Sequence, residues 1–115
     1  MYNWYSVRKP IRFVANSLEE LQEFPQDARR AAGYQLDRIQ RRSEPEGWKP
    51  LATIGPGVGE LRIRAFSGAF RVIYVARFEE AVYVLHCFQK TTRKTAQPDL
   101  KTARSRYRFV VRSRL

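Results

Sequence analysis

The sequence predicts a small α+β domain built on a three-stranded antiparallel meander. Three runs rich in Val, Ile, Tyr and Phe lie between residues 59 and 94, and only short polar turns at 67–68 and 79–80 separate them. Connections this short join antiparallel neighbours. Apolar residues at helical spacing precede and follow the meander. With a short strand near the N-terminus, the expected order is β-α-α-β-β-β-α, in one domain spanning residues 1–115.

The N-terminal third predicts one short strand and a pair of helices. Residues 1–9 show no organising pattern and are expected to form an arm, and residues 11–14 form the strand. The segment from Ser17 to Glu20 fits a capping box, in which the Ser17 hydroxyl accepts from a free backbone N–H and Glu20 reaches back to the cap. This helix must end before Pro25, which then opens the second helix. The apolar stripe of the second helix comprises Ala28, Ala32, Leu36 and Ile39.

The remaining segments predict a loop before the meander and a helix after it. Three prolines and three glycines punctuate residues 43–57, where Trp48 and Leu51 are expected to pin the loop to the core and Lys49 to be exposed. Pro98 and Asp99 suit the start of the last helix. Its apolar stripe comprises Leu100, Ala103, Tyr107 and Val110. A single crossover through the two N-terminal helices adds the first strand to a mixed sheet.

The composition points to a polyanionic partner. Twenty-two Lys and Arg residues against eleven Asp and Glu residues give a formal net charge of +11. Such a field favours nucleic acid, an acidic protein or an anionic membrane surface over neutral ligands. The single cysteine, Cys87, excludes an intramolecular disulfide and a Cys-rich metal site. No signal peptide or membrane span is evident, so we expect a soluble, cytoplasmic protein without a membrane partner.

Strand alternation predicts a face of the meander that carries cations. Arg62 and Arg64 share one face of the first strand, whereas Leu61 and Ile63 share the other. Arg71 lies on the second strand, and Lys90 ends the third. The full set of cations comprises Arg62, Arg64, Arg71, Lys90 and Lys94, with Tyr74, His86, Phe88 and Gln89 near them in sequence.

This set of residues favours RNA chemistry over other kinds of site. Paired carboxylates, a metal-ligand cluster and a phosphate-binding glycine loop are missing from the sequence, and neighbours His86 and Cys87 point to opposite faces. Arg and Lys can neutralise a phosphate and the added charge of its transition state. RNA supplies its own nucleophile, the 2′-OH, so no cofactor or metal is required. His86 could carry protons, although a packed strand histidine is equally compatible, and a lysine with a lowered pKa could serve instead.

Several motifs together resemble a known family of toxins. They are Lys49-Pro-Leu51, Glu60-Leu-Arg62, Ala69-Phe-Arg-Val-Ile-Tyr-Val75, Val84-Leu-His-Cys-Phe-Gln-Lys90 and Thr92-Arg-Lys-Thr95. In this order they resemble the phage-derived, HigB-like branch of the RelE superfamily, from about residue 9 to residue 107. The resemblance implies a type II toxin–antitoxin system and a metal-independent endoribonuclease that cuts mRNA on the ribosome. It also implies a small helix-turn-helix antitoxin as partner, in either a toxin homodimer or a toxin–antitoxin heterotetramer.

The resemblance also assigns roles to individual residues. Arg62 and Arg71 resemble the phosphate and transition-state cations of the family, and Lys90 and Lys94 resemble its basic strand end. The sequence departs from the pattern at Thr91, where relatives often carry a second lysine. We therefore expect Arg62, Arg71, His86 and Lys90 to be catalytic. We expect Lys49, Arg64, Phe88, Gln89, Arg93 and Lys94 to bind RNA.

Two other functions are compatible with the same residues. A basic module that binds RNA, the ribosome or a protein without turnover would explain Thr91 and the missing acid–base pair. A phage accessory protein that binds DNA through its arginine-rich helices is a weaker alternative, because no recognition helix is evident. A helix-turn-helix protein encoded next to this chain would favour the toxin.

Overall fold

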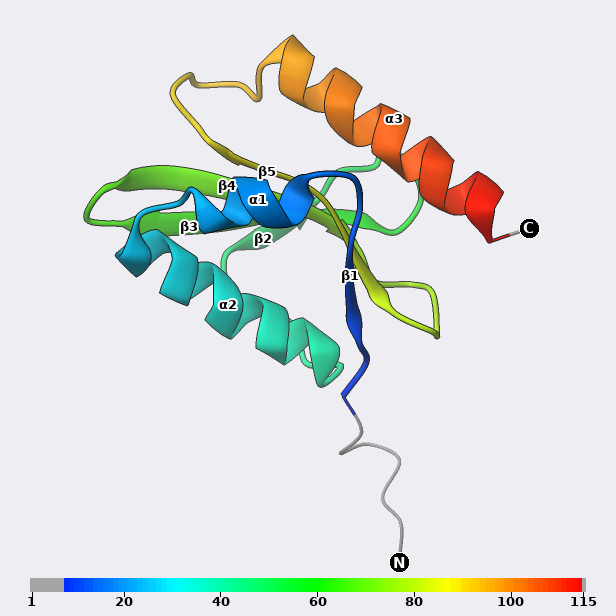
Figure 1. Ribbon diagram of the computed structural model, residues 1–115. Coiled ribbons are helices and arrows are strands. Elements are labelled where there is room, and N and C mark those ends of the chain that lie inside the picture. Colours follow the sequence, from blue (N-terminus) through cyan, green and yellow to red (C-terminus); the bar gives the residue numbers. More distant parts are fainter. Residues whose placement is uncertain (1–7, 115) are drawn as a thin grey trace, which may run out of the picture.

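The computed structural model describes residues 8–114 and has the predicted α+β architecture (Figure 1). The elements are β1 (Ile11–Phe13), α1 (Ser17–Gln22), α2 (Gln26–Gln40), β2 (Trp48–Pro50), β3 (Val58–Ala65), β4 (Gly68–Val75), β5 (Val82–Gln89) and α3 (Gln97–Ser113). The predicted meander is confirmed as β3, β4 and β5, with antiparallel pairing throughout. No helix in the described part of the chain is both long and apolar enough to cross a membrane.

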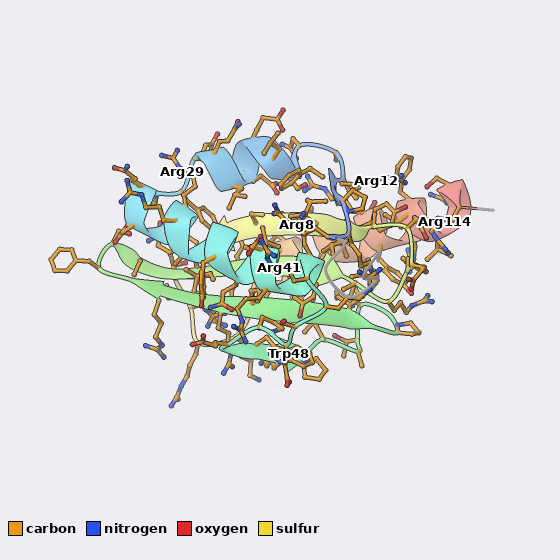
Figure 2. All side chains as sticks on the ribbon, turned by 90° about the horizontal axis from the view of Figure 1, so that it is seen from below. Arg8, Arg12, Arg29, Arg41, Trp48 and Arg114 are labelled. Carbon is orange, nitrogen blue, oxygen red and sulfur yellow. The ribbon has the colours of Figure 1, made fainter. Side chains whose placement is uncertain are left out.

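The five strands form one mixed sheet with helices on both faces. The strand order is β1-β5-β4-β3-β2, and β1 runs parallel to β5, as the predicted crossover requires. Helices α1 and α2 cover one face and α3 covers the other (Figure 1). Arg12 on β1 and Trp48 on β2 mark the two edges of the sheet (Figure 2).

One strand was not predicted from the sequence. Trp48–Pro50 was expected to lie in a loop, yet it pairs with Gly59–Leu61 of β3 as β2. Pro50 is compatible with this pairing because an edge strand needs backbone hydrogen bonds on one side only. The expected contacts with the core are confirmed, since Trp48 packs against the core under α2 and Leu51 against the core under α3.

The apolar stripes predicted for the two long helices are confirmed. All four predicted positions of α2 are buried, and those of α3 are buried except for Leu100, which is half-buried. The predicted arm lies largely outside the described residues. Its last residue, Lys9, is packed rather than free, because it is buried and its Nζ donates to the Ala76 carbonyl at 2.6 Å.

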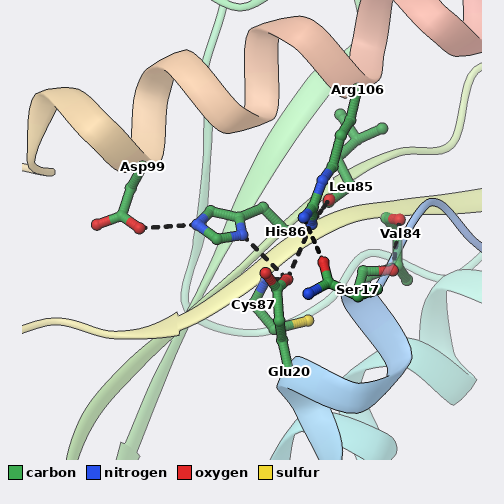
Figure 3. A network of polar contacts seen from close by, with 9 residues as sticks. Ser17, Glu20, Val84, Leu85, His86, Cys87, Asp99 and Arg106 are labelled. Atoms are coloured by element: carbon green, nitrogen blue, oxygen red, sulfur yellow. Dashed lines mark hydrogen bonds and ion pairs between the residues drawn. The ribbon is translucent and has the colours of Figure 1, made fainter.

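The predicted capping box at the start of α1 is wrong. Ser17 is fully buried, and its hydroxyl donates to the Val84 carbonyl of β5 at 3.1 Å instead of accepting from its own helix. Glu20 likewise turns away from the helix start, and its Oε1 accepts from the Cys87 backbone N–H at 3.1 Å (Figure 3). Both side chains therefore attach α1 to β5, because tertiary contacts override a local capping preference.

His86 joins three elements at this place. Its Nδ1 lies 3.0 Å from Oε1 of Glu20 on α1, and its Nε2 lies 2.7 Å from Oδ1 of Asp99 on α3 (Figure 3). Arg106 reinforces the contact, because its Nη1 donates to Glu20 at 3.0 Å and to the Leu85 carbonyl at 2.9 Å. We call Glu20, His86, Asp99 and Arg106 the clamp, since together they hold α1 and α3 on β5.

The clamp predicts how stability depends on pH. Burial lowers the pKa of His86, but hydrogen bonds to Glu20 and Asp99 outweigh this effect and leave the pKa raised above 6.5. A raised pKa in the folded state means that the stabilisation is complete below pH 6.5 and is lost as the pH rises through the folded value. We expect the free energy of unfolding, measured with urea, to fall between pH 6 and pH 9.

His86→Gln tests the origin of this slope. The variant should lose about 2 kcal/mol at pH 6, because the half-buried carboxylates of Glu20 and Asp99 lose a charged partner, and its stability should change less between pH 6 and pH 9. The same pH dependence in both proteins would show that His86 does not carry it.

Candidate nucleic-acid interface

Strand register places the predicted arginines side by side. Arg62 of β3 lies opposite Arg71 of β4, and Arg64 lies two residues further along β3. Leu61 and Ile63 are buried in the core under α2, so the arginines occupy the opposite face, as alternation predicts. Helix α3 packs on this face over β5, whereas Arg62 and Arg64 remain exposed on β3. A cationic surface is therefore left open beside α3.

A cleft of about 680 Å³ opens along β3 beyond the end of β2. Four arginines contribute to its walls, namely Arg62, Arg64, Arg71 and Arg93. Three come from neighbouring strands, and Arg93 comes from the loop between β5 and α3. Residues of α2 and the turn before β2 complete the lining, with Glu46 as its acidic member. The excess of fixed positive charge makes the cleft attractive to a polyanion.

A buried carboxylate lies beside this cleft. Glu60 is only 1% exposed, and it projects on the same face as Arg62. Its Oε1 lies 3.9 Å from both Lys49 Nζ and Arg71 Nε, and its Oε2 accepts from the Thr95 hydroxyl at 3.1 Å. Glu60 thus partly compensates the positive charge of the neighbouring cations on the sheet. Its hydrogen bond with Thr95 also attaches the β5–α3 loop to β3.

Arg71 is the most enclosed cation of the cleft. The residue is 8% exposed, and its Nη1 donates to the Phe70 carbonyl at 3.0 Å. Its Nε is buried without a hydrogen-bond acceptor among the described residues. Burial lowers the pKa of Arg71, and neighbouring Arg62 and Arg64 add to this effect while Glu60 opposes it. An anion that enters the cleft would reduce the charge repulsion among these cations.

Lys90 directly follows β5 and lies close to Arg71. The pKa of Lys90 is lowered, first by burial and then by the positive charge of Arg71. Its backbone N–H donates to the Ala69 carbonyl at 2.8 Å, which fixes the strand end beside β4. Lys49, predicted to be exposed, is exposed on β2 and reaches Glu60. Lys90 therefore lies close to Arg71 and Glu60, and burial and the charge of Arg71 shift its pKa downward.

The other predicted residues lie around the cleft or away from it. Lys94 and Gln89 are exposed, and Gln89 lies beside Gly68 at the β3–β4 turn. Phe88 is half-buried, and its ring stacks on His86 with the centroids 4.9 Å apart. His86 does not line the cleft, and carboxylates occupy both of its ring nitrogens. This geometry supports the packed strand histidine instead of the proton carrier.

Two contributors to the site were not assigned a role from the sequence. In the sequence, Glu60 and Thr95 stand out only as members of the motifs Glu60-Leu-Arg62 and Thr92-Arg-Lys-Thr95. Alternation places Glu60 with the arginines, but the loop contact of Thr95 has no local sequence signal. Within residues 8–114, no three His, Cys, Asp or Glu side chains are grouped to hold a metal ion.

Comparison with known proteins identifies the family. The family model described as "Phage derived protein Gp49-like (DUF891)" matches residues 19–108, a span that includes every cation of the cleft. No curated protein matches the chain. Because the family model covers well over half of the sequence, this chain belongs to the Gp49-like family of phage-derived proteins.

Proposed function

We propose that this protein is the toxin of a type II toxin–antitoxin system and cleaves mRNA on the ribosome without a metal. The observation that carries the proposal is the pairing of exposed Arg62 with buried Arg71 at the wall of one cleft. Membership of a phage-derived family of RelE-like, toxin-related type supports it. The HigB-like motifs of the sequence favour the same assignment.

The cleavage would use the substrate's own nucleophile. The 2′-oxygen attacks the adjacent phosphorus, the bond from phosphorus to the 5′-oxygen breaks, and a 2′,3′-cyclic phosphate and a 5′-hydroxyl result. A base takes the 2′-hydroxyl proton, and the departing 5′-oxygen receives one. Arg62 and Arg71 would neutralise the charge that accumulates on the phosphate oxygens. Lys90 is our candidate proton carrier because its pKa is lowered beside these arginines.

A protein that binds RNA or the ribosome without cleaving is the second candidate. The observation in its favour is that both ring nitrogens of His86, the sole histidine of the chain, contact carboxylates of the clamp. That leaves no side chain with an ordinary pKa near neutrality beside the cleft. Mapping of RNA ends distinguishes the two functions, since only the enzyme creates new 5′-hydroxyl ends.

We further propose that a small helix-turn-helix antitoxin neutralises the toxin, in a complex that also sets its oligomeric state. The formal net charge of +11 favours an acidic partner surface. Co-purification with the product of the adjacent reading frame, followed by sedimentation, would establish both the partner and the stoichiometry.

Replacing Arg62 tests the enzyme. Arg62 is exposed, so Arg62→Ala should fold, while the loss of one transition-state cation should slow cleavage by about 100-fold. The measurement is the rate at which 5′-hydroxyl ends appear on mRNA in a translation reaction with purified protein. Arg29→Ala on α2 is the control, since Arg29 is also exposed but lies outside the lining of the cleft and donates to the Gln22 carbonyl. Equal rates for both variants and the parent would contradict the assignment.

Glu60→Gln tests the buried counter-charge. The amide keeps the shape and can still accept from Thr95, but Arg71 and Lys49 lose their shared anion. We expect a loss of about 1–3 kcal/mol in stability and a fall in kcat larger than any rise in KM, because Arg71 would no longer be held in position.

The matched control for this variant is Glu46→Gln, at the exposed rim of the cleft. If kcat is unchanged in Glu60→Gln, whether or not stability is lost, Glu60 does not hold Arg71 in position for catalysis.

A further inference from the structure

Phe66 is fully exposed at the tip of the β3–β4 hairpin. Its relative exposure is 104%, the highest among the exposed large hydrophobic residues of the described chain. The others, on α1, α2 and α3, are Leu18, Tyr34 and Phe109. Within residues 8–114, Phe66 is therefore the one exposed large hydrophobic residue of this hairpin, and a single ring is smaller than the apolar patches of stable protein interfaces.

The hairpin tip is held in place by hydrogen bonds. Asp27 at the start of α2 accepts from the Ser67 backbone N–H at 3.2 Å and from the Ser67 hydroxyl at 2.8 Å. Hydrogen bonds from Ser67 lower the pKa of Asp27, so the carboxylate stays charged near neutral pH. Gly68 completes the turn at φ +138°, a conformation that suits glycine. The backbone that presents Phe66 is thus fixed, which reduces the entropy lost when a ligand binds.

The exposed ring lies at the end of the cationic strand. Arg64 and Arg62 precede Phe66 by two and four residues on β3, which corresponds to about 7 and 13 Å along a strand. The end of β5 lies alongside, because Lys90 pairs with Ala69 of the same hairpin. A ligand that runs along Arg62 and Arg64 therefore reaches the ring next.

We propose that Phe66 stacks on an unpaired base of an RNA strand whose phosphates lie on Arg62 and Arg64. The inference rests on the proposed function and adds a residue that selects single-stranded RNA. Stacking needs one accessible aromatic face beside a positive groove, and both are present. Duplex RNA keeps its bases stacked on one another and offers none to the ring.

The test is the affinity for a fluorescently labelled, single-stranded RNA, measured by anisotropy with the full chain. Phe66→Ala should weaken binding by about tenfold, as the loss of one stacked base does, and Phe66→Trp should bind within about twofold of the parent. The dependence on salt should not change in either variant, since no phosphate contact is lost. Tyr34→Ala, which removes another exposed aromatic residue from α2, is the control and should bind like the parent.

Two comparisons separate this inference from the proposed function. Arg62→Ala combined with Arg64→Ala should lower the salt slope by about 1.4, because two phosphate contacts disappear. An RNA of the same length without bases should bind the parent and Phe66→Ala equally.

If the arginine variant loses affinity while Phe66→Ala binds like the parent, stacking is refuted and the RNA-binding cleft stands. If the parent binds neither RNA, stacking on free RNA is refuted, whereas the proposed function is still decided by whether new 5′-hydroxyl ends appear in the translation reaction. If Phe66→Ala alters only the sedimentation of the protein, the ring belongs to a protein contact and stacking is again refuted.

Discussion

The buried carboxylate of Glu60 is the interaction on which the cationic face depends. Arginines on adjacent strands repel each other, and burial of Arg71 adds a desolvation cost. Glu60 offsets part of the repulsion and part of the desolvation cost, because its Oε1 lies 3.9 Å from both Arg71 and Lys49. Through Thr95 it also holds the loop that brings Arg93 to the cleft. One side chain therefore links the stability of the sheet to the shape of the surface that we assign to RNA.

The clamp keeps two acidic side chains away from this surface. Glu20 and Asp99 would weaken a site for polyanions if they faced the cleft, but His86 and Arg106 hold them at the junction of α1, β5 and α3. Two of the eleven acidic residues are thereby held away from the cleft, whose lining contains four arginines and one acidic residue, Glu46.

The sequence predicted what depends on periodicity and missed what depends on distant contacts. The meander, the two apolar stripes and the shared face of Arg62 and Arg64 follow from spacings of two and of three to four residues. The capping box failed because Ser17 and Glu20 bond to β5, which lies more than 60 residues away. The edge strand β2 escaped detection because Pro50 and the surrounding prolines resemble a loop. For the site, alternation identified the cations, but only coordinates could place His86 inside the clamp and Phe66 outside the core.

The parallel pairing of β1 with β5 constrains how the chain can be made. Arg12 and Tyr83 are register partners that lie 71 positions apart, so the N-terminal strand has no neighbour until most of the polypeptide exists. Closing so long a loop is slow, and a chain still emerging during translation lacks β5 altogether. The arginine pair Arg62 and Arg71 needs only the β3–β4 hairpin, whereas Lys90 joins it only once β5 has paired with β4. A nascent chain in which Arg93 has not yet been added lacks one of the four arginines that line the cleft.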